Sequence, residues 1–261
     1  MKPFSLVRYA LLILIPGLSF AAENYKAPRT EWGLPDLQGV GNFSSDTPMQ
    51  RPSQYGTRQF LTDEELLQFQ SRTAAGNEAS DATIQGTGVD ESYNDFWIES
   101  AGLGRGRLTS HIIYPENGRL PAIQENAYRI EFGKIPERPV RSALGINYGT
   151  DGPEDRPLSD RCLVGFNAGP PVNPSFYNNN LQIIQNKDHV VIITEMVHDA
   201  RIVPMDNRPH APEEIGLWSG DSRGYWDGDS LVVETRNFNG LTNSFSAIGS
   251  SENKHLTEKF T

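Results

Sequence analysis

The chain has 261 residues and a formal net charge of -10 at pH 7. Such an acidic surface disfavours nucleic-acid binding, because phosphates require basic side chains, and it disfavours polyanionic substrates away from any local arginine cluster. The single cysteine, Cys162, excludes an intramolecular disulfide and any cysteine-based zinc or iron–sulfur site. Because free cysteines are mostly buried, Cys162 is expected to be a structural thiol in the interior.

Residues 1–21 have the pattern of a secretory signal peptide. Lys2 and Arg8 precede an apolar run over 9–20, and Ser19-Phe20-Ala21 fits a cleavage site of mostly small residues. The run is about twelve residues long, whereas roughly twenty are needed to cross a bilayer. The sequence therefore predicts a periplasmic or secreted protein with no membrane span after cleavage.

The segment after the signal peptide predicts an extended arm over residues 22–60, followed by one domain over residues 61–261. The arm is rich in proline, glycine and polar side chains and shows no sustained periodicity. A few apolar side chains are expected to pin it to the domain surface: Trp32, Leu34, Leu37 and Phe43.

Two short helices are expected in the first half of the domain. Thr62 and Glu65 form a capping-box pattern ahead of apolar positions, which predicts the first helix, and a weaker pattern over 122–132 predicts the second. Between them, 110–114 is expected to be a strand ended by a turn at 115–118, where the sequence is Pro-Glu-Asn-Gly.

The rest of the chain favours long irregular loops and antiparallel hairpins. Residues 133–180 are dense in proline and glycine, and so long an irregular segment is typical of a lid or a pocket wall. Two hairpins and a final strand are expected from β-branched runs and turn sequences. Their strands are expected at 181–185, 189–199, 224–226, 231–238 and 255–261. We therefore predict a mainly β fold, an antiparallel barrel-like or sandwich-like domain with two short helices and long irregular loops.

The segment at 220–235 reads GDSRGYWDGDSLVVET and resembles a signature of an uncharacterised family of exported bacterial proteins. The resemblance covers most of the mature chain. It extends to the segments Leu37-Gln38-Gly39, Tyr93-Asn94-Asp95-Phe96-Trp97, Tyr177-Asn178-Asn179-Asn180 and His198-Asp199-Ala200-Arg201. It implies export and a single long domain, and no activity carries over from it. Family members continue beyond the position of Thr261, which implies, together with the strand at the chain end, a truncated C-terminus.

An acid, a base and a cation occur within seven residues at the end of the predicted strand 189–199. In the functional interpretation a histidine transfers protons, an aspartate tunes it, and an arginine binds an anionic or carbonyl oxygen. The candidate catalytic residues are His198, Asp199, Arg201, Asp221 and Arg223. In the alternative interpretation the same residues form a structural network that braces the hairpins.

Other chemistry has weaker support in the sequence. Ser222 lies in a G-x-S-x-G pattern, but a nucleophile elbow needs a helix after it, and a hairpin is expected there. Several residues offer metal-binding atoms without a recognised spacing, so no metal is expected: His198, His210, Glu195, Asp199 and Asp206. The glycines at 102–106 lack the strand and helix of a nucleotide site, so no cofactor is expected.

A small-molecule pocket is expected near the second hairpin, walled by aromatic side chains or, in the alternative, simply packed in the core. The candidate ligand-binding residues are Trp218, Tyr225, Trp226 and Asn179. Three functions stay open. The first is an exported enzyme for hydrolysis, elimination or isomerisation. The others are a periplasmic binding protein and an envelope scaffold that engages a protein partner through its arm or strand edges.

Overall fold

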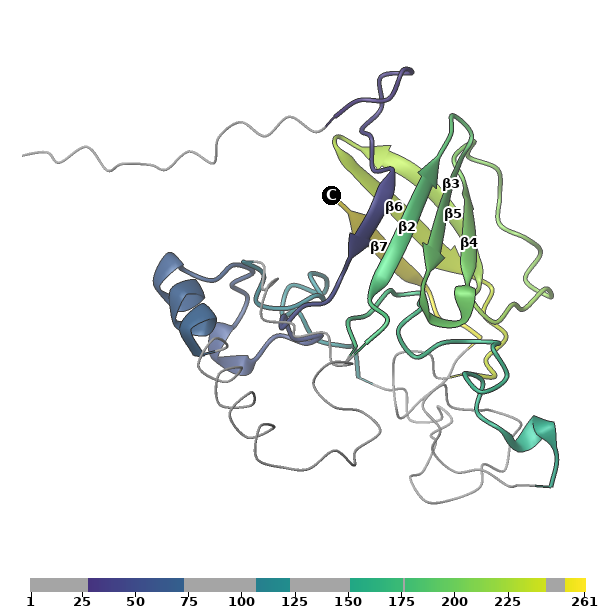
Figure 1. Ribbon diagram of the computed structural model, residues 1–261, viewed down its shortest axis with the longest axis horizontal. Coiled ribbons are helices and arrows are strands. Elements are labelled where there is room, and N and C mark those ends of the chain that lie inside the picture. Colours follow the sequence, from purple (N-terminus) through teal and green to yellow (C-terminus); the bar gives the residue numbers. More distant parts are fainter. Residues whose placement is uncertain (1–27, 73–106, 123–150, 176, 243–251) are drawn as a thin grey trace, which may run out of the picture.

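The computed structural model describes residues 28–72, 107–122, 151–175, 177–242 and 252–261 (Figure 1). The predicted signal peptide, the glycines at 102–106 and nearly all of the predicted helix 122–132 lie outside these residues. Within these residues, seven strands form two antiparallel sheets, with the orders β1-β2-β3-β4 and β5-β6-β7. The strands are β1 Gly39–Asn42, β2 Asn180–Gln185, β3 His189–Thr194, β4 Ala200–Pro204, β5 Asp221–Asp227, β6 Ser230–Arg236 and β7 Leu256–Phe260.

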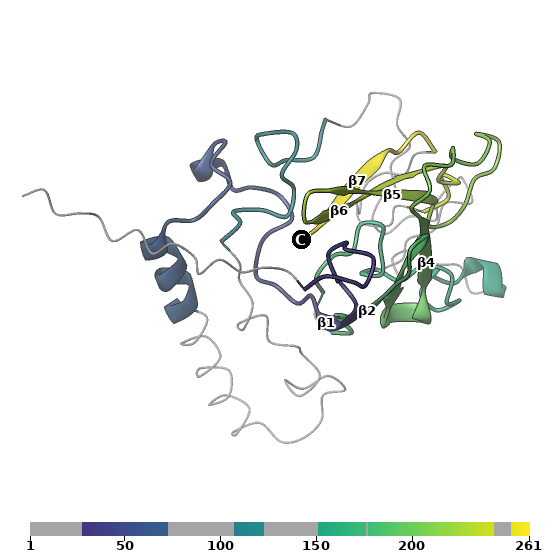
Figure 2. The same cartoon turned by 90° about the horizontal axis from the view of Figure 1, so that it is seen from above.

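The prediction of a mainly β, antiparallel fold is confirmed, and the arrangement is sandwich-like. Figure 2 shows β5, β6 and β7 as one layer, with β1 and β2 in the other. The barrel-like alternative is wrong, because no hydrogen-bonded ladder joins the two described sheets. A shared core lies between the layers and consists of Ile183, Val190, Ile192, Val203, Leu231 and Val233. Burial of these branched side chains is the main source of stability for such a packing.

Close approach of the two layers depends on a glycine in β5. A Cβ atom at Gly224 would lie 2.5 Å from Met205 Sδ and 2.8 Å from Val203 Cγ1. These separations are shorter than van der Waals contact, so any larger residue would push the β4 side of the first sheet away from β5. The glycine in the segment GDSRGYW therefore has a packing role.

The arm contributes a strand to the first sheet. Residues Gly39–Asn42 form β1, which pairs antiparallel with β2 from Gly39 opposite Ile183 to Asn42 opposite Asn180. Leu37 packs against the shared core, as expected for a residue that pins the arm. The arm is thus integrated into the sheet through backbone hydrogen bonds as well as lying over it.

The first predicted helix is confirmed, and residues 63–72 are helical. Its capping box forms both bonds: Glu65 N donates to Thr62 Oγ1 at 3.2 Å, and Thr62 N donates to Glu65 Oε2 at 2.8 Å. These bonds satisfy amides that have no partner inside the helix.

The predicted strand at 110–114 is wrong, although the turn after it is confirmed. His111 N and Ile112 N donate to the carbonyl oxygens of Pro48 and Met49, and no regular ladder forms. The turn is closed by a 2.7 Å bond from Gly118 N to the carbonyl of Pro115. A proline-containing partner segment cannot donate a continuous row of amides, which explains the irregular pairing.

The second half confirms both predicted hairpins, β2-β3 and β5-β6, and the final strand β7. The prediction of one long strand over 189–199 is wrong, since β3 ends at Thr194. A 3-10 turn, η4 Met196–His198, follows, with Val197 and His198 at φ 55° and 56°. The chain then returns as β4, antiparallel to β3. No glycine or asparagine marks this reversal, so the alternating pattern concealed it.

Candidate functional site

The five predicted catalytic residues do not meet at one point. Arg201 extends from β4 to the other sheet, where its guanidinium forms an ion pair with Glu258 of β7. Both side chains are only 9 % exposed, and Glu258 Oε1 also accepts a 3.1 Å bond from Val172 N. Arg201 therefore joins the two sheets, with its guanidinium held by a carboxylate of the protein.

His198 and Asp199 are adjacent in sequence but have separate environments. The His198 side chain is exposed at the end of η4. Asp199 Oδ2 accepts a 3.1 Å hydrogen bond from the Ser219 hydroxyl, which belongs to the segment leading into β5. The turn between β3 and β4 thus separates this histidine from the carboxylate that was expected to tune it.

Asp221 and Arg223 do lie together, on the same face of β5. Arg223 Nη1 donates to Asp221 Oδ1 at 2.6 Å, as expected for residues two apart in a strand, whose side chains share a face. Arg223 also donates to the carbonyl oxygens of Pro209 at 2.8 Å and Arg208 at 3.2 Å. These bonds attach the loop that connects β4 and β5 to the strand.

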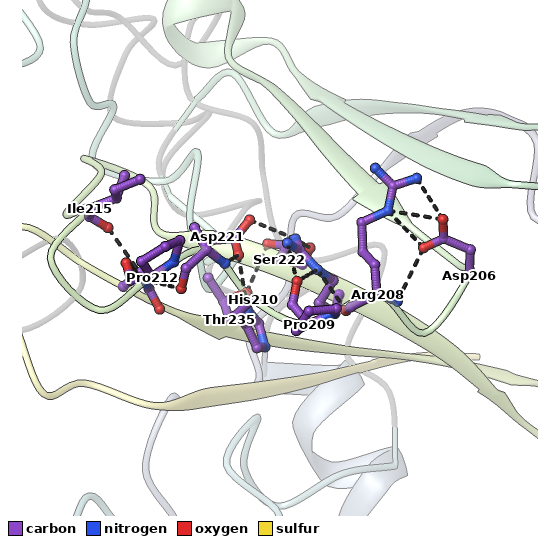
Figure 3. A network of polar contacts seen from close by, with 12 residues as sticks. Asp206, Arg208, Pro209, His210, Pro212, Ile215, Asp221, Ser222 and Thr235 are labelled. Atoms are coloured by element: carbon purple, nitrogen blue, oxygen red, sulfur yellow. Dashed lines mark hydrogen bonds and ion pairs between the residues drawn. The ribbon is translucent and has the colours of Figure 1, made fainter.

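The same loop brings His210 to Asp221, as Figure 3 shows. His210 Nδ1 lies 3.1 Å from Asp221 Oδ2, and this oxygen also accepts a 2.9 Å bond from Ala211 N. The His210 side chain is 18 % exposed and its Nε2 atom makes no hydrogen bond to any residue that the structure describes. The ring is thus held at one nitrogen and accessible at the other.

The charge of Asp221 fixes the proton on His210. Burial raises the pKa of Asp221, but the bonds from Ala211 N, Arg223 and His210 together hold it below its ordinary value. The carboxylate is therefore ionised at neutral pH and can only accept hydrogen bonds. His210 must donate through Nδ1, which leaves the Nε2 lone pair of the neutral ring available to take a proton.

The loop has an internal ion pair near its start and is bonded near its end to the residue that follows β6, and His210 lies between these two points. At its start, a bidentate bond from Arg208 lowers the pKa of Asp206 to about 2, with contacts of 2.6 to 2.9 Å. At its end, Asn237 Nδ2 donates to the carbonyl oxygens of Ala211 at 3.0 Å and Pro212 at 2.9 Å. Figure 3 shows this chain of contacts running along the loop.

The four predicted ligand-binding residues are dispersed. Trp218 packs against a small cluster of Leu158 and Val164, and Trp226 packs against the core between the sheets. Asn179 is fully buried and exchanges two 2.8 Å bonds with the backbone of Ser175. Tyr225, at 44 % exposure, is the only one of the four on the same face of β5 as Asp221 and Arg223.

Two further residues singled out by the sequence have simple structural positions. Ser222 is buried in β5, and its hydroxyl lies 2.9 Å from that of Thr235, so the environment is not that of a nucleophile elbow. The prediction of a buried Cys162 is wrong, because its side chain is exposed. Cys162 has φ 52° in a turn closed by its own 3.0 Å bond to the carbonyl of Ser159, and the turn directs the thiol outward.

From the sequence alone, His210 was expected only as a possible metal ligand. Across the described ranges, no group of three or more histidine, cysteine, aspartate and glutamate side chains is arranged to hold a metal ion. The pairing with Asp221 had no sequence signal, because an irregular loop with two prolines carries no periodicity from which a facing residue follows.

Comparisons with known proteins identify no relative. No family model, no curated protein and no solved structure matches the chain. The resemblance of 220–235 to an exported family therefore stays a prediction. Within the described residues, no helix has the length and apolar character to cross a membrane.

Proposed function

We propose that this chain is an exported protein that carries out acid–base chemistry on a small molecule, with His210 Nε2 as the proton-transferring atom. The observation that supports it is the 3.1 Å contact of His210 Nδ1 with an ionised Asp221, which leaves Nε2 without a hydrogen bond in the described part of the chain. A histidine oriented by a carboxylate and accessible at its other nitrogen is the usual form of a general base.

The neighbouring residues have positioning roles in this proposal. Asp221 fixes the tautomer and stabilises the imidazolium that forms when Nε2 takes a proton. Arg223 donates hydrogen bonds to Asp221 and to the carbonyl oxygens of the loop that carries His210. Its role is therefore to hold the histidine in place and not to bind the substrate. His210 replaces His198 as the reacting histidine, and Asp221 and Arg223 keep a place in the site.

The reaction classes that fit are hydrolysis, elimination and isomerisation. In each, the base removes a proton from a water or a carbon acid and returns it to a leaving group or to another carbon. The substrate class is a small neutral or mildly anionic molecule, because the net charge of -10 repels a polyanion.

The test is turnover of a defined panel by wild type, H210Q, H198Q, D221N and the control H189Q, whose histidine lies on β3. The panel contains p-nitrophenyl esters, lactones and 2-hydroxy acids. We expect turnover above buffer for one class, a loss of about 100-fold or more in H210Q, and an intermediate loss in D221N. No change is expected in H189Q. Wild-type inactivity on every class, or loss in H198Q with H210Q still active, would contradict the proposal.

A binding protein is the second candidate, and the exposure of Tyr225 favours it. Its ring is 44 % exposed on the face that carries Asp221 and Arg223, where it offers an apolar wall beside polar groups. A binder would keep its affinity for a ligand from the same panel in H210Q and lose it in Y225A. An enzyme would lose turnover in H210Q while a dead-end ligand still binds.

A further inference from the structure

Arg51 belongs to a small packed unit formed by residues 47–61 and 107–119, here called the N-terminal unit. Arg51 N donates to the carbonyl of Gly118 at 2.8 Å, and Thr109 N donates to that of Gln59 at 2.8 Å. The unit has buried polar residues at its centre: Thr47, Arg51, Thr109 and Ser110. Its interior is thus much more polar than the core between the two sheets.

The Arg51 side chain is enclosed but incompletely bonded. The residue is 1 % exposed, its Nε donates to Thr109 Oγ1 at 2.9 Å, and its Nη1 donates to the carbonyl of Glu116. Its Nη2 is buried and has no hydrogen-bond partner. Among the described residues, no carboxylate forms an ion pair with Arg51, so both of its acceptors are neutral oxygens.

Such a group is costly to bury. A guanidinium stays charged at every physiological pH, so it cannot reduce the cost by losing its proton. Arginine is rarely fully buried without a partner, and an uncompensated buried charge costs several kcal/mol. An anion that accepts bonds from Nη2 would remove both deficits, because it supplies the missing acceptor and the missing negative charge.

A second unbonded polar atom lies in the same unit. His111 Nε2 is buried and has no hydrogen-bond partner, and burial lowers the pKa of His111 below its ordinary value. His111 follows Thr109 and Ser110 in the segment that borders Arg51. Two such atoms in one small unit are unusual, since buried polar side-chain atoms are normally hydrogen-bonded, and each leaves a bond that a polar ligand could complete.

We propose that Arg51 anchors a buried site for a small anion, a phosphate or a carboxylate, bound through Nη2. The site is separate from the His210 network and involves none of its residues. Its place in the N-terminal unit makes the anion part of the folded structure of 47–61 and 107–119. Binding therefore adds to stability through the mass action of a ligand that binds only the native state.

The test is thermal unfolding of the protein with millimolar inorganic phosphate, acetate or chloride at one pH and one ionic strength. The constant ionic strength and low concentration exclude the general stabilisation of proteins by phosphate. We expect a saturating rise in Tm with phosphate or acetate and none with chloride. R51M is expected to lose that rise, and the control R58Q, which removes an exposed arginine paired with Glu65, is expected to keep it.

Isothermal titration of the wild type with the same phosphate and acetate solutions provides a measurement that needs no variant. Saturable binding that weakens at least tenfold in R51K, which keeps the charge but loses the planar donors, supports the site. If phosphate alone binds, the guest is a phosphate group, and if acetate alone binds, it is a carboxylate. No saturable binding of either anion, or binding by R51M as tight as by the wild type, would overturn the proposal and leave water as the partner of Nη2.

Discussion

Among the described residues, the buried arginines Arg201 and Arg51 differ in whether a carboxylate balances their charge. Arg201 lies between the sheets and meets the carboxylate of Glu258, with both side chains 9 % exposed. Arg51 is 1 % exposed in the N-terminal unit, and its acceptors are a hydroxyl and a carbonyl. The sandwich thus balances its own buried charge, whereas the N-terminal unit supplies no carboxylate to Arg51 from its described residues.

The largest effect is expected from breaking the balanced pair with E258Q. Removing one partner leaves the buried Arg201 charge without compensation, which costs about 3–5 kcal/mol of unfolding free energy. Urea denaturation of wild type and variant measures the difference. The double variant R201M/E258L is expected to recover most of the loss, because it removes both charges. A loss below about 1 kcal/mol in E258Q would mean that the pair is solvated and the contrast with Arg51 is smaller than stated.

A smaller effect, with a defined pH dependence, is expected from Lys254 beside the same pair. Burial lowers the pKa of Lys254 to about 8, against a smaller opposing effect of the Glu258 charge, and its Nζ lies 3.8 Å from the centre of the Phe238 ring. Between pH 8 and about 10.4 the unfolded chain binds a proton that the folded chain lacks, so stability rises with pH.

The rise is expected to be about 3 kcal/mol across that window, and the contribution is expected to be absent in K254M. The measurement is the urea midpoint of wild type minus that of K254M at each pH from 7.5 to 10.5. The subtraction removes the contributions of other titrating lysines and tyrosines. In E258Q the window should begin at a lower pH, because the carboxylate that favours the charged amine is gone. Stability that falls with pH in the difference curve would contradict the assignment.

The sequence predicts local structure well where a short segment contains all the information. Asp227-Gly228 marks the β5-β6 turn, and the Thr62 and Glu65 pattern marks the helix start, because both features depend on residues a few positions apart. The reversal after β3 was missed because Val197 and His198 adopt left-handed backbone conformations that such residues seldom take. Because β3 ends at Thr194, His198 lies in the turn that follows and not beside the other candidate residues on the strands.

The candidate site was only partly predictable for a related reason. Asp221 and Arg223 were candidates because of their acidic and cationic side chains, and they share a face because β5 begins at Asp221, before the predicted strand start. The partners of Arg201 and Asp221 were not predicted, since Glu258 is 57 positions from Arg201 and His210 lies in a loop. Contacts between distant segments depend on how the layers pack, which no local pattern encodes.

The smallest stability effect is expected from R51M in a buffer that contains neither phosphate nor carboxylate. The substitution loses the bonds to Thr109 and to the carbonyl of Glu116, each worth on the order of 1 kcal/mol, but it also removes an uncompensated buried charge. The two contributions oppose each other, so we expect a net loss of only about 1 kcal/mol in the urea experiment. Adding phosphate or acetate should widen the gap, because only the wild type gains binding energy. A loss in anion-free buffer as large as that of E258Q would show that Arg51 is already balanced within the protein and would remove the contrast between the two arginines.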